Sequence, residues 1–307
     1  MKFKQLTKEF LIYKKNFVKE SSAAAYWLLT ENHIIPYFGK MDTDKISEYM
    51  VQTFVLEKIS SGLSVKTVKD VMIVIKMIFK YGKKIGVKVG GFEKFEIDYP
   101  SDNSFLKEKL QTYSKEEIKI IRQHIIENFS FRNLGILIAV STGVRIGELC
   151  GLQWKDIDLE NGNVTVSRTV QRIYFNDNGK NRTKIVITAP KTKTGHRVIP
   201  LSKELLLIIK PLMRVVKKDN YILSNSIKPD EARTYRCFYE KFLKEIGLHY
   251  IKFHGLRHTF ATLCITSGID VKTVSVMLGH HDVSTTLDLY SHPSFANKKA
   301  AINKIFN

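Results

Sequence analysis

The stretch HGLRHTFAT, residues 254–262, places two histidines and one arginine at the spacing of a helix. If these residues are helical, His254, Arg257 and His258 share one face, because side chains three and four positions apart are neighbours on a helix. Leu256 then points toward a core. The stretch therefore predicts a helix with a cationic face, which suits a phosphate group.

A zinc site is the main alternative for this stretch. His254 and His258 have the spacing of two zinc ligands, but the metalloprotease pattern requires a glutamate beside the first histidine, where this chain has Gly255. No clear third ligand follows, and Arg257 between the two histidines would repel a dication. The RHG signature of His-phosphatases is also absent, because Thr259 follows the Arg-His pair. We therefore expect no metal here.

Two earlier stretches add further cations. In TGVRIGEL, residues 142–149, a turn delivers Arg145 to the start of a helix. In KTKTGHRVIPL, residues 191–201, Gly195 predicts the tight turn of a β-hairpin, which would place Lys193 on an exposed tip. Taken singly, an arginine beside a helix and a basic loop are more simply interpreted as solvated surface.

The stretch LGHHDVSTTLDLYSH, residues 278–292, adds histidines and a tyrosine. His280 follows Gly279, which we expect to end a helix. Ser284 is expected to cap a short helix that ends at Tyr290. A lone tyrosine at such a place would more often be a half-buried packing residue.

Together the four stretches supply two guanidinium groups, one ammonium, two imidazoles and one phenol. The six side chains are Arg145, Lys193, His254, Arg257, His280 and Tyr290. No cluster of Asp and Glu suited to Mg²⁺ accompanies them. Such a set suits metal-free phosphoryl transfer, in which cations stabilise the pentacoordinate phosphate and a side-chain oxygen attacks it.

The composition favours a polyanionic partner. The 307 residues include 49 Lys and Arg against 30 Asp and Glu, a formal net charge of +19. Both sides of residue 100 are basic, so the charge is not a detachable tail. Lys and Arg that neutralise phosphates supply most of the non-specific affinity for nucleic acid. A Lys-biased soluble protein without such a partner is the plain alternative.

Several other protein classes are disfavoured. Hydrophobic residues make up 44% of the chain, which argues against wholesale disorder, and no apolar run approaches the ~20 residues that span a bilayer. The first residues, MKFKQLTKEF, lack the apolar segment of a signal peptide, so we expect a cytoplasmic, nucleoid-associated protein. Cys150, Cys237 and Cys264 form neither a disulfide framework nor a CxxC metal site.

The hydrophobic pattern predicts two domains and a mainly α fold with a small antiparallel β-sheet. Residues 1–88 fit four helices in a small bundle, with Ser64 as the cap of the fourth. Residues 89–112, with paired glycines and mixed charge, are predicted to be a linker. The second domain, residues 113–307, opens with a capping box at Ser114 and continues through β-hairpins into mostly helical sequence.

The four stretches, in this order and spacing, closely resemble the tyrosine recombinases, also called phage-integrase-type or Xer-like recombinases. The match spans residues 113–295, and the helical first half resembles the family's core DNA-binding domain by pattern. The resemblance implies a C-shaped clamp of two domains around double-stranded DNA. It also implies a site-specific recombinase that acts in integration, excision or dimer resolution. Such an enzyme is a DNA strand transferase, and the resemblance implies that it needs no metal, ATP or other cofactor.

The resemblance also implies a role for each side chain. Tyr290 attacks the scissile phosphate and forms a 3′-phosphotyrosyl link, which frees a 5′-hydroxyl. Arg145 and Arg257 clamp the non-bridging oxygens. Lys193 protonates the leaving 5′-oxygen.

The two histidines and a glutamate complete the implied site. His254 and His280 are expected to hydrogen-bond the phosphate and to help move the proton from Tyr290. Glu148 is expected to orient Arg145 without touching the phosphate.

The resemblance further implies a homo-oligomer on DNA, because the family works as tetramers on two duplexes. A short amphipathic tail helix, residues 298–306, is expected to dock either on its own domain or on a neighbouring protomer. From position alone, the candidate DNA contacts are Lys66, Lys69, Arg233 and Arg236.

Two other classes share part of this pattern. A type IB topoisomerase-like enzyme uses the same chemistry for strand passage, and a non-catalytic DNA-binding protein would show the charge without needing the six side chains. Because only residues 1–6 precede the first predicted helix, we expect no arm-site-binding domain, which favours compact Xer-like or mobile-element enzymes. The target sequence and biological role cannot be inferred from the chain, because base contacts and DNA deformability decide them.

Overall fold

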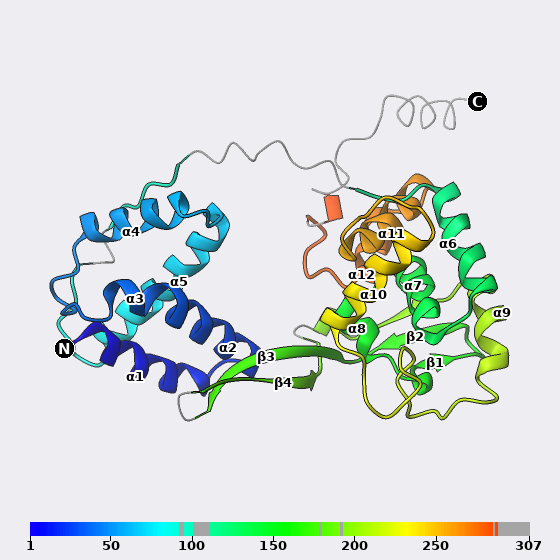
Figure 1. Cartoon of the computed structure of the whole chain (residues 1–307), viewed down its shortest axis with the longest axis horizontal. Coiled ribbons are helices and arrows are strands. Elements are labelled where there is room, and N and C mark those ends of the chain that lie inside the picture. Colours follow the sequence, from blue (N-terminus) through cyan, green and yellow to red (C-terminus); the bar gives the residue numbers. More distant parts are fainter. Residues whose placement is uncertain (92–94, 101–110, 178–179, 191–192, 285, 288–307) are drawn as a thin grey trace. The chain divides into compact units, whose positions relative to one another are not determined.

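Helices are the main secondary structure of the residues that the structure describes (Figure 1). The structure, a computed structural model, describes residues 1–91, 95–100, 111–177, 180–190, 193–284 and 286–287. The chain divides into two compact units. The first holds Met1–Lys107 and Ile173–Lys184, and the second holds Glu108–Arg172 and Ile185–Asn307.

The first unit is a helical bundle. Its helices are α1 (Phe3–Lys15), α2 (Glu20–Leu29), α3 (Ile35–Phe38), α4 (Glu48–Ser60) and α5 (Val65–Lys84). The second of the four expected helices is divided, because a π-helical turn (Thr30–Ile34) separates α2 from α3. Pro36 lies in the first turn of α3, and its missing N–H interrupts the regular hydrogen-bond ladder there.

The long helix α5 carries much of the first core. Ser64 caps it by accepting a hydrogen bond from the N–H of Thr67 (3.1 Å), as expected. Apolar residues at helical spacing bury one face, where Phe79 packs against Phe3 of α1 with ring centroids 5.4 Å apart. The same spacing leaves the lysines of α5 exposed on the other side.

Part of the predicted linker packs on the first unit. Asp98 exchanges two backbone hydrogen bonds with the side chain of Gln52 on α4 (2.9 and 3.0 Å), and the N–H of Glu96 donates to the carboxylate of Glu48 (2.7 Å). Residues 95–100 therefore belong to the first unit, because their backbone groups find side-chain partners on α4. The boundaries of the two predicted domains stay a prediction.

The second unit combines helices with two small sheets. Its helices are α6 (Lys115–Glu127), α7 (Phe131–Thr142), α8 (Ile146–Gly151), α9 (Lys203–Leu212), α10 (Ala232–Glu245), α11 (His254–Thr266) and α12 (Val271–Leu278). The strands are β1 (Ile157–Asp158), β2 (Asn163–Val166), β3 (Thr169–Asp177), β4 (Lys180–Thr188) and β5 (Arg197–Pro200). Part of the β3–β4 hairpin is counted with the first unit.

Strand pairing differs from the prediction at one place. The hairpin turn predicted at Gly195 is wrong: Lys193–Gly195 forms a 3₁₀ turn between β4 and β5, which belong to different sheets. β3 pairs with β4, whereas β1, β2 and β5 form an antiparallel sheet in that order. Alternation reveals a strand but not its partner, and β5 pairs with β2 because Ile199 and Val164 share a buried face.

Helix α7 lies at the centre of a group of helices in the second unit. Most side chains of α7 are buried, and α7 packs against α6, α8 and α11. Gly143 ends α7 in the left-handed region at φ 66°, and a Cβ there would lie 2.6 Å from Phe260. This tight turn brings Arg145 to the start of α8.

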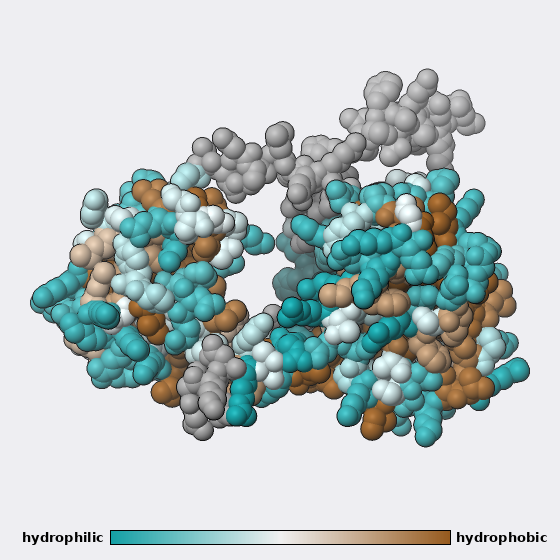
Figure 2. All heavy atoms as spheres, viewed as in Figure 1, coloured by the Kyte–Doolittle hydropathy of each residue, from teal (hydrophilic) through white to brown (hydrophobic). Residues whose placement is uncertain are grey.

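The surfaces of the two units are more hydrophilic than their cores. Hydrophilic residues cover most of the visible face of each unit, and some apolar residues appear on the side of the second unit where α9 lies (Figure 2). Leu207 on α9 is exposed there. Scattered exposed apolar residues of this kind are normal for a folded domain.

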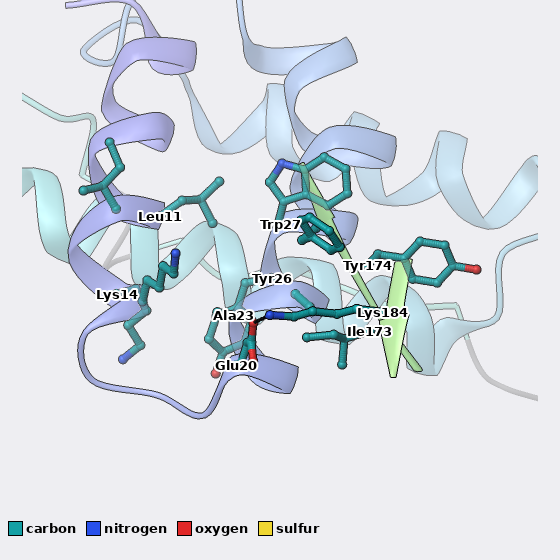
Figure 3. A pocket seen from close by; sticks show the side chains of 13 residues that line it. Leu11, Lys14, Glu20, Ala23, Tyr26, Trp27, Ile173, Tyr174 and Lys184 are labelled. Atoms are coloured by element: carbon teal, nitrogen blue, oxygen red, sulfur yellow. Dashed lines mark ion pairs between the residues drawn. The ribbon is translucent and has the colours of Figure 1, made fainter. Parts of the chain in front are cut away.

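A cavity of about 400 Å³ lies within the first unit (Figure 3). Residues of α1, α2 and the Ile173–Lys184 part of the hairpin line it, including the aromatic side chains of Trp27 and Tyr174. Lys184 forms an ion pair with Glu20 beside it. The lining is mostly apolar and includes none of the six predicted active-site side chains, so this cavity is not the phosphate site.

The start of α6 offers a test of local stability. Ser114 and Glu117 form the predicted capping box, in which the N–H of Ser114 donates to Glu117 (2.8 Å) and the N–H of Glu117 donates to the hydroxyl of Ser114 (3.2 Å). Ser114→Ala should lower the free energy of unfolding of the second unit by about 1 kcal/mol, because one backbone donor loses its partner. Chemical denaturation monitored by circular dichroism measures this. The matched control Ser114→Thr keeps the hydroxyl and should stay near wild type; equal loss in both variants would contradict the capping role.

Candidate functional site

The carboxylate of Glu148 is the centre of a buried ion-pair network. It accepts from the backbone N–H of Arg145 (Oε2, 2.9 Å) and from Nη1 of Arg145 (Oε1, 2.9 Å). It also accepts two bonds from Arg197, one from Nη2 to Oε2 (2.9 Å) and one from Nη1 to Oε1 (3.2 Å). The side chains of Glu148 and Arg197 are only 5% and 4% exposed. Two guanidinium groups therefore share one carboxylate.

Glu148 stays ionised at this place. Burial by itself would raise the pKa of the carboxyl, but the hydrogen bonds and charge of Arg197, followed by those of Arg145, outweigh burial and hold the pKa below its ordinary value. One negative charge thus faces two positive ones, and the network keeps a net positive charge.

The two predicted arginines lie in one region. Arg145 is 42% exposed on its side chain, and its Nη2 donates to the carbonyl oxygen of Gly279 (3.3 Å). Arg257 on α11 is buried, and its Nη1 donates to the carbonyl oxygen of Gly143 (2.8 Å), two residues before Arg145. The end of α7, the start of α8 and the start of α11 therefore bring both guanidinium groups together.

Both predicted histidines join this cationic group. Desolvation by the surrounding protein, followed by the charges of His258, Arg257 and Arg145, lowers the pKa of His254 to about 4, although the residue keeps part of its surface exposed. Desolvation, followed by Arg257 and Arg145, likewise lowers the pKa of His280 to about 4. His254 lies three residues before Arg257 on α11, and His280 follows Gly279, whose carbonyl oxygen accepts from Arg145. The two imidazoles therefore lie near the two guanidinium groups, and their lowered pKa values keep them neutral at pH 7.

Neighbouring side chains orient the two imidazoles. The rings of His254 and His258 lie edge to face on α11, with centroids 4.7 Å apart and planes at 89°. A hydrogen bond of 2.7 Å joins Nδ1 of His280 to the hydroxyl of Thr286, which is fully buried. A hydroxyl both donates and accepts, so Thr286 serves either tautomer of His280 and leaves Nε2 for a ligand.

The remaining predicted site residues lie partly outside the described residues. The backbone of Lys193 begins the 3₁₀ turn before β5, and its side chain is not among the parts of the chain that the structure describes. Tyr290 and the predicted tail helix, residues 298–306, also lie outside it. The expected cap at Ser284 is not seen. Ser284 is itself a helical residue, and its N–H donates to the carboxylate of Asp282 (2.9 Å).

The candidate DNA contacts are exposed residues of both units. Lys66 and Lys69 are exposed on α5 in the first unit, and the Lys69 ammonium lies 5.0 Å from the centre of the Tyr99 ring. Arg233 and Arg236 are exposed in the first turns of α10 in the second unit. Their exposure leaves them accessible, and their role stays a prediction.

Sequence reasoning missed Arg197 and Thr286. A signal for Arg197 exists in the sequence, because along β5 it alternates with Val198 and so shares the inward face of Ile199, where an apolar residue would be expected. No comparable signal marks Thr286, since its contact with His280 depends on how the chain turns after α12.

Metal and membrane sites are not indicated by the described residues. Within 1–91, 95–100, 111–177, 180–190, 193–284 and 286–287, no group of three or more His, Cys, Asp or Glu side chains could hold a metal ion. In the same part of the chain, no helix has the length and apolar character needed to cross a membrane.

Sequence comparisons match both parts of the chain. The profile of the phage integrase family matches residues 110–297, which include the whole cationic group. The chain belongs to the phage integrase family. A second profile, the N-terminal SAM-like domain of phage integrases, matches residues 2–59. The predicted family of tyrosine recombinases is thereby confirmed, and the chain is a DNA recombinase of that family.

Individual relatives agree with the family. The chain is 28% identical to a XerC-like tyrosine recombinase of Caldanaerobacter subterraneus subsp. tengcongensis, over 94% of this chain and 79% of the relative. It is 27% identical to the ICEBs1 integrase of Bacillus subtilis, over 86% of this chain and 72% of the relative.

Solved structures show the same fold. The Tn1549 transposon integrase in complex with transposon right-end DNA superposes with a TM-score of 0.79 at 23% identity, covering 100% of both chains. A λ integrase dimer bound to a core site gives 0.66 at 16% identity, covering 94% of this chain and 77% of the other. The predicted mainly α fold with small antiparallel sheets is therefore confirmed.

The lowered pKa values predict how stability of this integrase-family protein depends on pH. Between about pH 6.5 and pH 4, the unfolded chain binds protons at His254 and His280 that the folded protein does not bind, so the free energy of unfolding should fall as the pH falls through this window. Thermal unfolding midpoints from pH 7 to 4.5 measure this. The variant His254→Gln should show a weaker dependence of the unfolding midpoint on pH. The control His281→Gln, which changes an exposed histidine, should keep the wild-type dependence. A His254→Gln protein with the wild-type slope would refute the lowered pKa.

Proposed function

We propose that this recombinase cleaves and rejoins DNA at specific sites through a covalent 3′-phosphotyrosyl intermediate formed by Tyr290. The observation that carries the proposal is the grouping of Arg145, Arg257, His254 and His280 at the junction of α7, α8, α11 and α12. The residues of this group come from three of the four family-like stretches, and Lys193 comes from the fourth.

The cations supply the electrostatic part of the reaction. In-line attack places additional negative charge on the non-bridging oxygens of the pentacoordinate phosphate, and preorganised guanidinium donors stabilise that charge. We assign this task to Arg145 and Arg257. Because Glu148 and the carbonyl oxygen of Gly143 already hold these groups, little reorganisation is needed when DNA arrives.

The proton and bond changes balance without a cofactor. The phenolic oxygen of Tyr290 forms a bond to phosphorus, and the bond from phosphorus to the 5′-oxygen breaks. The phenolic proton passes toward the neutral imidazoles of His254 and His280, and Lys193 donates a proton to the leaving 5′-oxygen. Rejoining is the reverse attack by a 5′-hydroxyl on the phosphotyrosine. The phosphoester is exchanged and not hydrolysed, so no ATP is required.

A bound phosphate also changes the imidazoles. Their low pKa values arise partly from the neighbouring arginines, and the negative charge of a scissile phosphate offsets that repulsion. The pKa of both histidines should therefore rise toward its ordinary value on DNA. An imidazole with a pKa nearer 7 is a better proton acceptor for the attacking phenol.

We further propose that the partner is a double-stranded recombination site held by both units as a C-shaped clamp, with Lys66, Lys69, Arg233 and Arg236 among the contacts. The net charge of +19 supports a DNA partner. Similar proteins have been solved on DNA: the Tn1549 integrase on transposon DNA and a λ integrase tetramer on a Holliday junction, the latter with a TM-score of 0.64 at 16% identity, covering 92% of this chain and 79% of the other.

On the same grounds we propose a tetrameric synapse, acting on DNA in the cytoplasm. The tail helix, residues 298–306, is proposed to dock on its own domain or on a neighbouring protomer. Deleting residues 298–307 and measuring synaptic assembly separates the two arrangements.

The decisive test is covalent capture of DNA. The wild-type protein is incubated with fragmented DNA of its source, trapped covalently, and the attached fragment is sequenced to recover the site. On a nicked suicide substrate that carries this site, Tyr290→Phe should form no covalent adduct, because the attacking oxygen is absent, while DNA affinity stays near wild type. Denaturing gels and mobility shifts measure the two quantities. An adduct that persists in Tyr290→Phe would assign the nucleophile to another residue.

Chelation tests the metal-free chemistry. Adduct formation by the wild-type protein should proceed at the same rate in the presence of excess EDTA, because cationic side chains and not a metal ion stabilise the phosphate. Single-turnover rates with and without EDTA measure this. A metal-dependent nuclease included as a control should lose activity under the same conditions. A large loss of adduct formation that added Mg²⁺ restores would contradict the proposed mechanism.

A further inference from the structure

Arg197 donates hydrogen bonds from all three of its guanidinium nitrogens, and it is not one of the six residues that the family resemblance names. Its guanidinium donates from Nε to the carbonyl oxygen of Met277 (2.6 Å), from Nη1 to Glu148 and to the carbonyl oxygen of Gly195 (both 3.2 Å), and from Nη2 to Glu148 (2.9 Å). One side chain thus joins α8, the 3₁₀ turn before β5 and the end of α12.

The position of Arg197 in the sheet makes this possible. It is the first residue of β5, paired with Val166 of β2, and it faces inward on the same side as Ile199. A charged residue at an inward position is costly unless its donors are satisfied. The contacts with one carboxylate and two carbonyl oxygens satisfy that requirement.

Because Arg197 shares Glu148, the positive charge of Arg145 is not fully neutralised by that carboxylate. If Glu148 faced Arg145 alone, the pair would be neutral and the carboxylate would compete with a phosphate for the same guanidinium. With Arg197 supplying two of the four bonds to Glu148, Arg145 needs only one side-chain bond to it. The pair of arginines with one glutamate then keeps one net positive charge.

A second contact ties Arg197 to the segment that carries His280. Gly279 ends α12 at φ 67°, and a Cβ built there would lie 2.8 Å from the carbonyl oxygen of Thr194 and 3.0 Å from Cδ and Nη1 of Arg197. The backbone before His280 therefore lies directly against both Arg197 and the turn that begins at Lys193.

We propose that Arg197 is a positioning residue of the recombination site. It holds the Glu148 carboxylate so that Arg145 is oriented toward the scissile phosphate with its charge available, and it locks the turn at Lys193 against the segment at His280. This inference rests on the proposed phosphotyrosyl chemistry, and it assigns Arg197 no contact with DNA.

The test compares Arg197→Lys with wild type in single-turnover covalent capture on the suicide substrate, using the full chain at saturating DNA. Lysine keeps the charge but cannot bridge Glu148 and the carbonyl oxygens together. Capture should slow by up to about 100-fold, because a misplacement of about 1 Å at the reacting centre can cost that much, while DNA affinity stays unchanged. Glu148→Gln should show the same pattern.

A second substrate separates positioning from general damage. A methylphosphonate at the scissile position replaces one non-bridging oxygen by a methyl group and removes the charge that Arg145 is proposed to meet. The defect of Arg197→Lys should shrink on this substrate, in parallel with that of Arg145→Ala. A merely structural defect reduces the active fraction and slows both substrates equally, and that outcome would overturn the proposal.

Arg168 provides the matched control. It forms another partly buried pair in the same unit, donating to Asp156 (2.7 Å) and to the carbonyl oxygen of Gly151 (3.3 Å), without contact to Glu148. Arg168→Lys should leave the capture rate per DNA-binding molecule unchanged on both substrates. Loss of capture in this control equal to that in Arg197→Lys would also overturn the proposal.

The outcomes distinguish the inference from the function on which it rests. If the wild-type protein forms no adduct, the phosphotyrosyl mechanism fails. If the wild type and Arg168→Lys form adduct and Arg197→Lys does so equally fast, the mechanism stands and the role of Arg197 is wrong.

Discussion

The geometry of the site depends on one carboxylate shared by two guanidinium groups. Glu148 accepts four hydrogen bonds, two from Arg145 and two from Arg197, and it lies in the interior, where each charge would be unfavourable alone. Removing one partner of such a buried pair typically costs about 3–5 kcal/mol, because an uncompensated charge remains. This constraint holds the start of α8, the start of β5 and the end of α12 in one arrangement.

The electrostatics around this carboxylate prepare the site for an anion. Three arginines, at positions 145, 197 and 257, outnumber the single glutamate. Desolvation first, and then the charges of neighbouring arginines, lower the pKa of the two nearby imidazoles and keep them neutral at pH 7. A folded protein that keeps like charges close together sacrifices some stability. A phosphodiester relieves that repulsion, so the same feature that strains the free protein favours binding and transition-state stabilisation.

The fold explains how residues distant in sequence come together. Gly143 ends α7 with a left-handed turn, which presents Arg145 and its neighbouring carbonyl oxygen to Arg257 on α11. Gly279 ends α12 in the same way and brings His280 beside Arg145. Two glycine-terminated helices therefore deliver side chains from separate parts of the chain to one place, while the sheet β1-β2-β5 supplies Arg197 from a third direction.

The sequence by itself determined several helices and pointed to the residues of the cationic group. Helical spacing and capping signals located α5, α6 and α11, since these depend on neighbouring residues. The short motifs identified Arg145, Arg257, His254 and His280, which the structure brings together. Only the tertiary structure decided the pairing of β5 with β2, the attachment of residues 95–100 to α4, and the contacts of Arg197 and Thr286. These arise between residues distant in sequence, and local periodicity carries no information about which distant partner a strand or a buried polar group will meet.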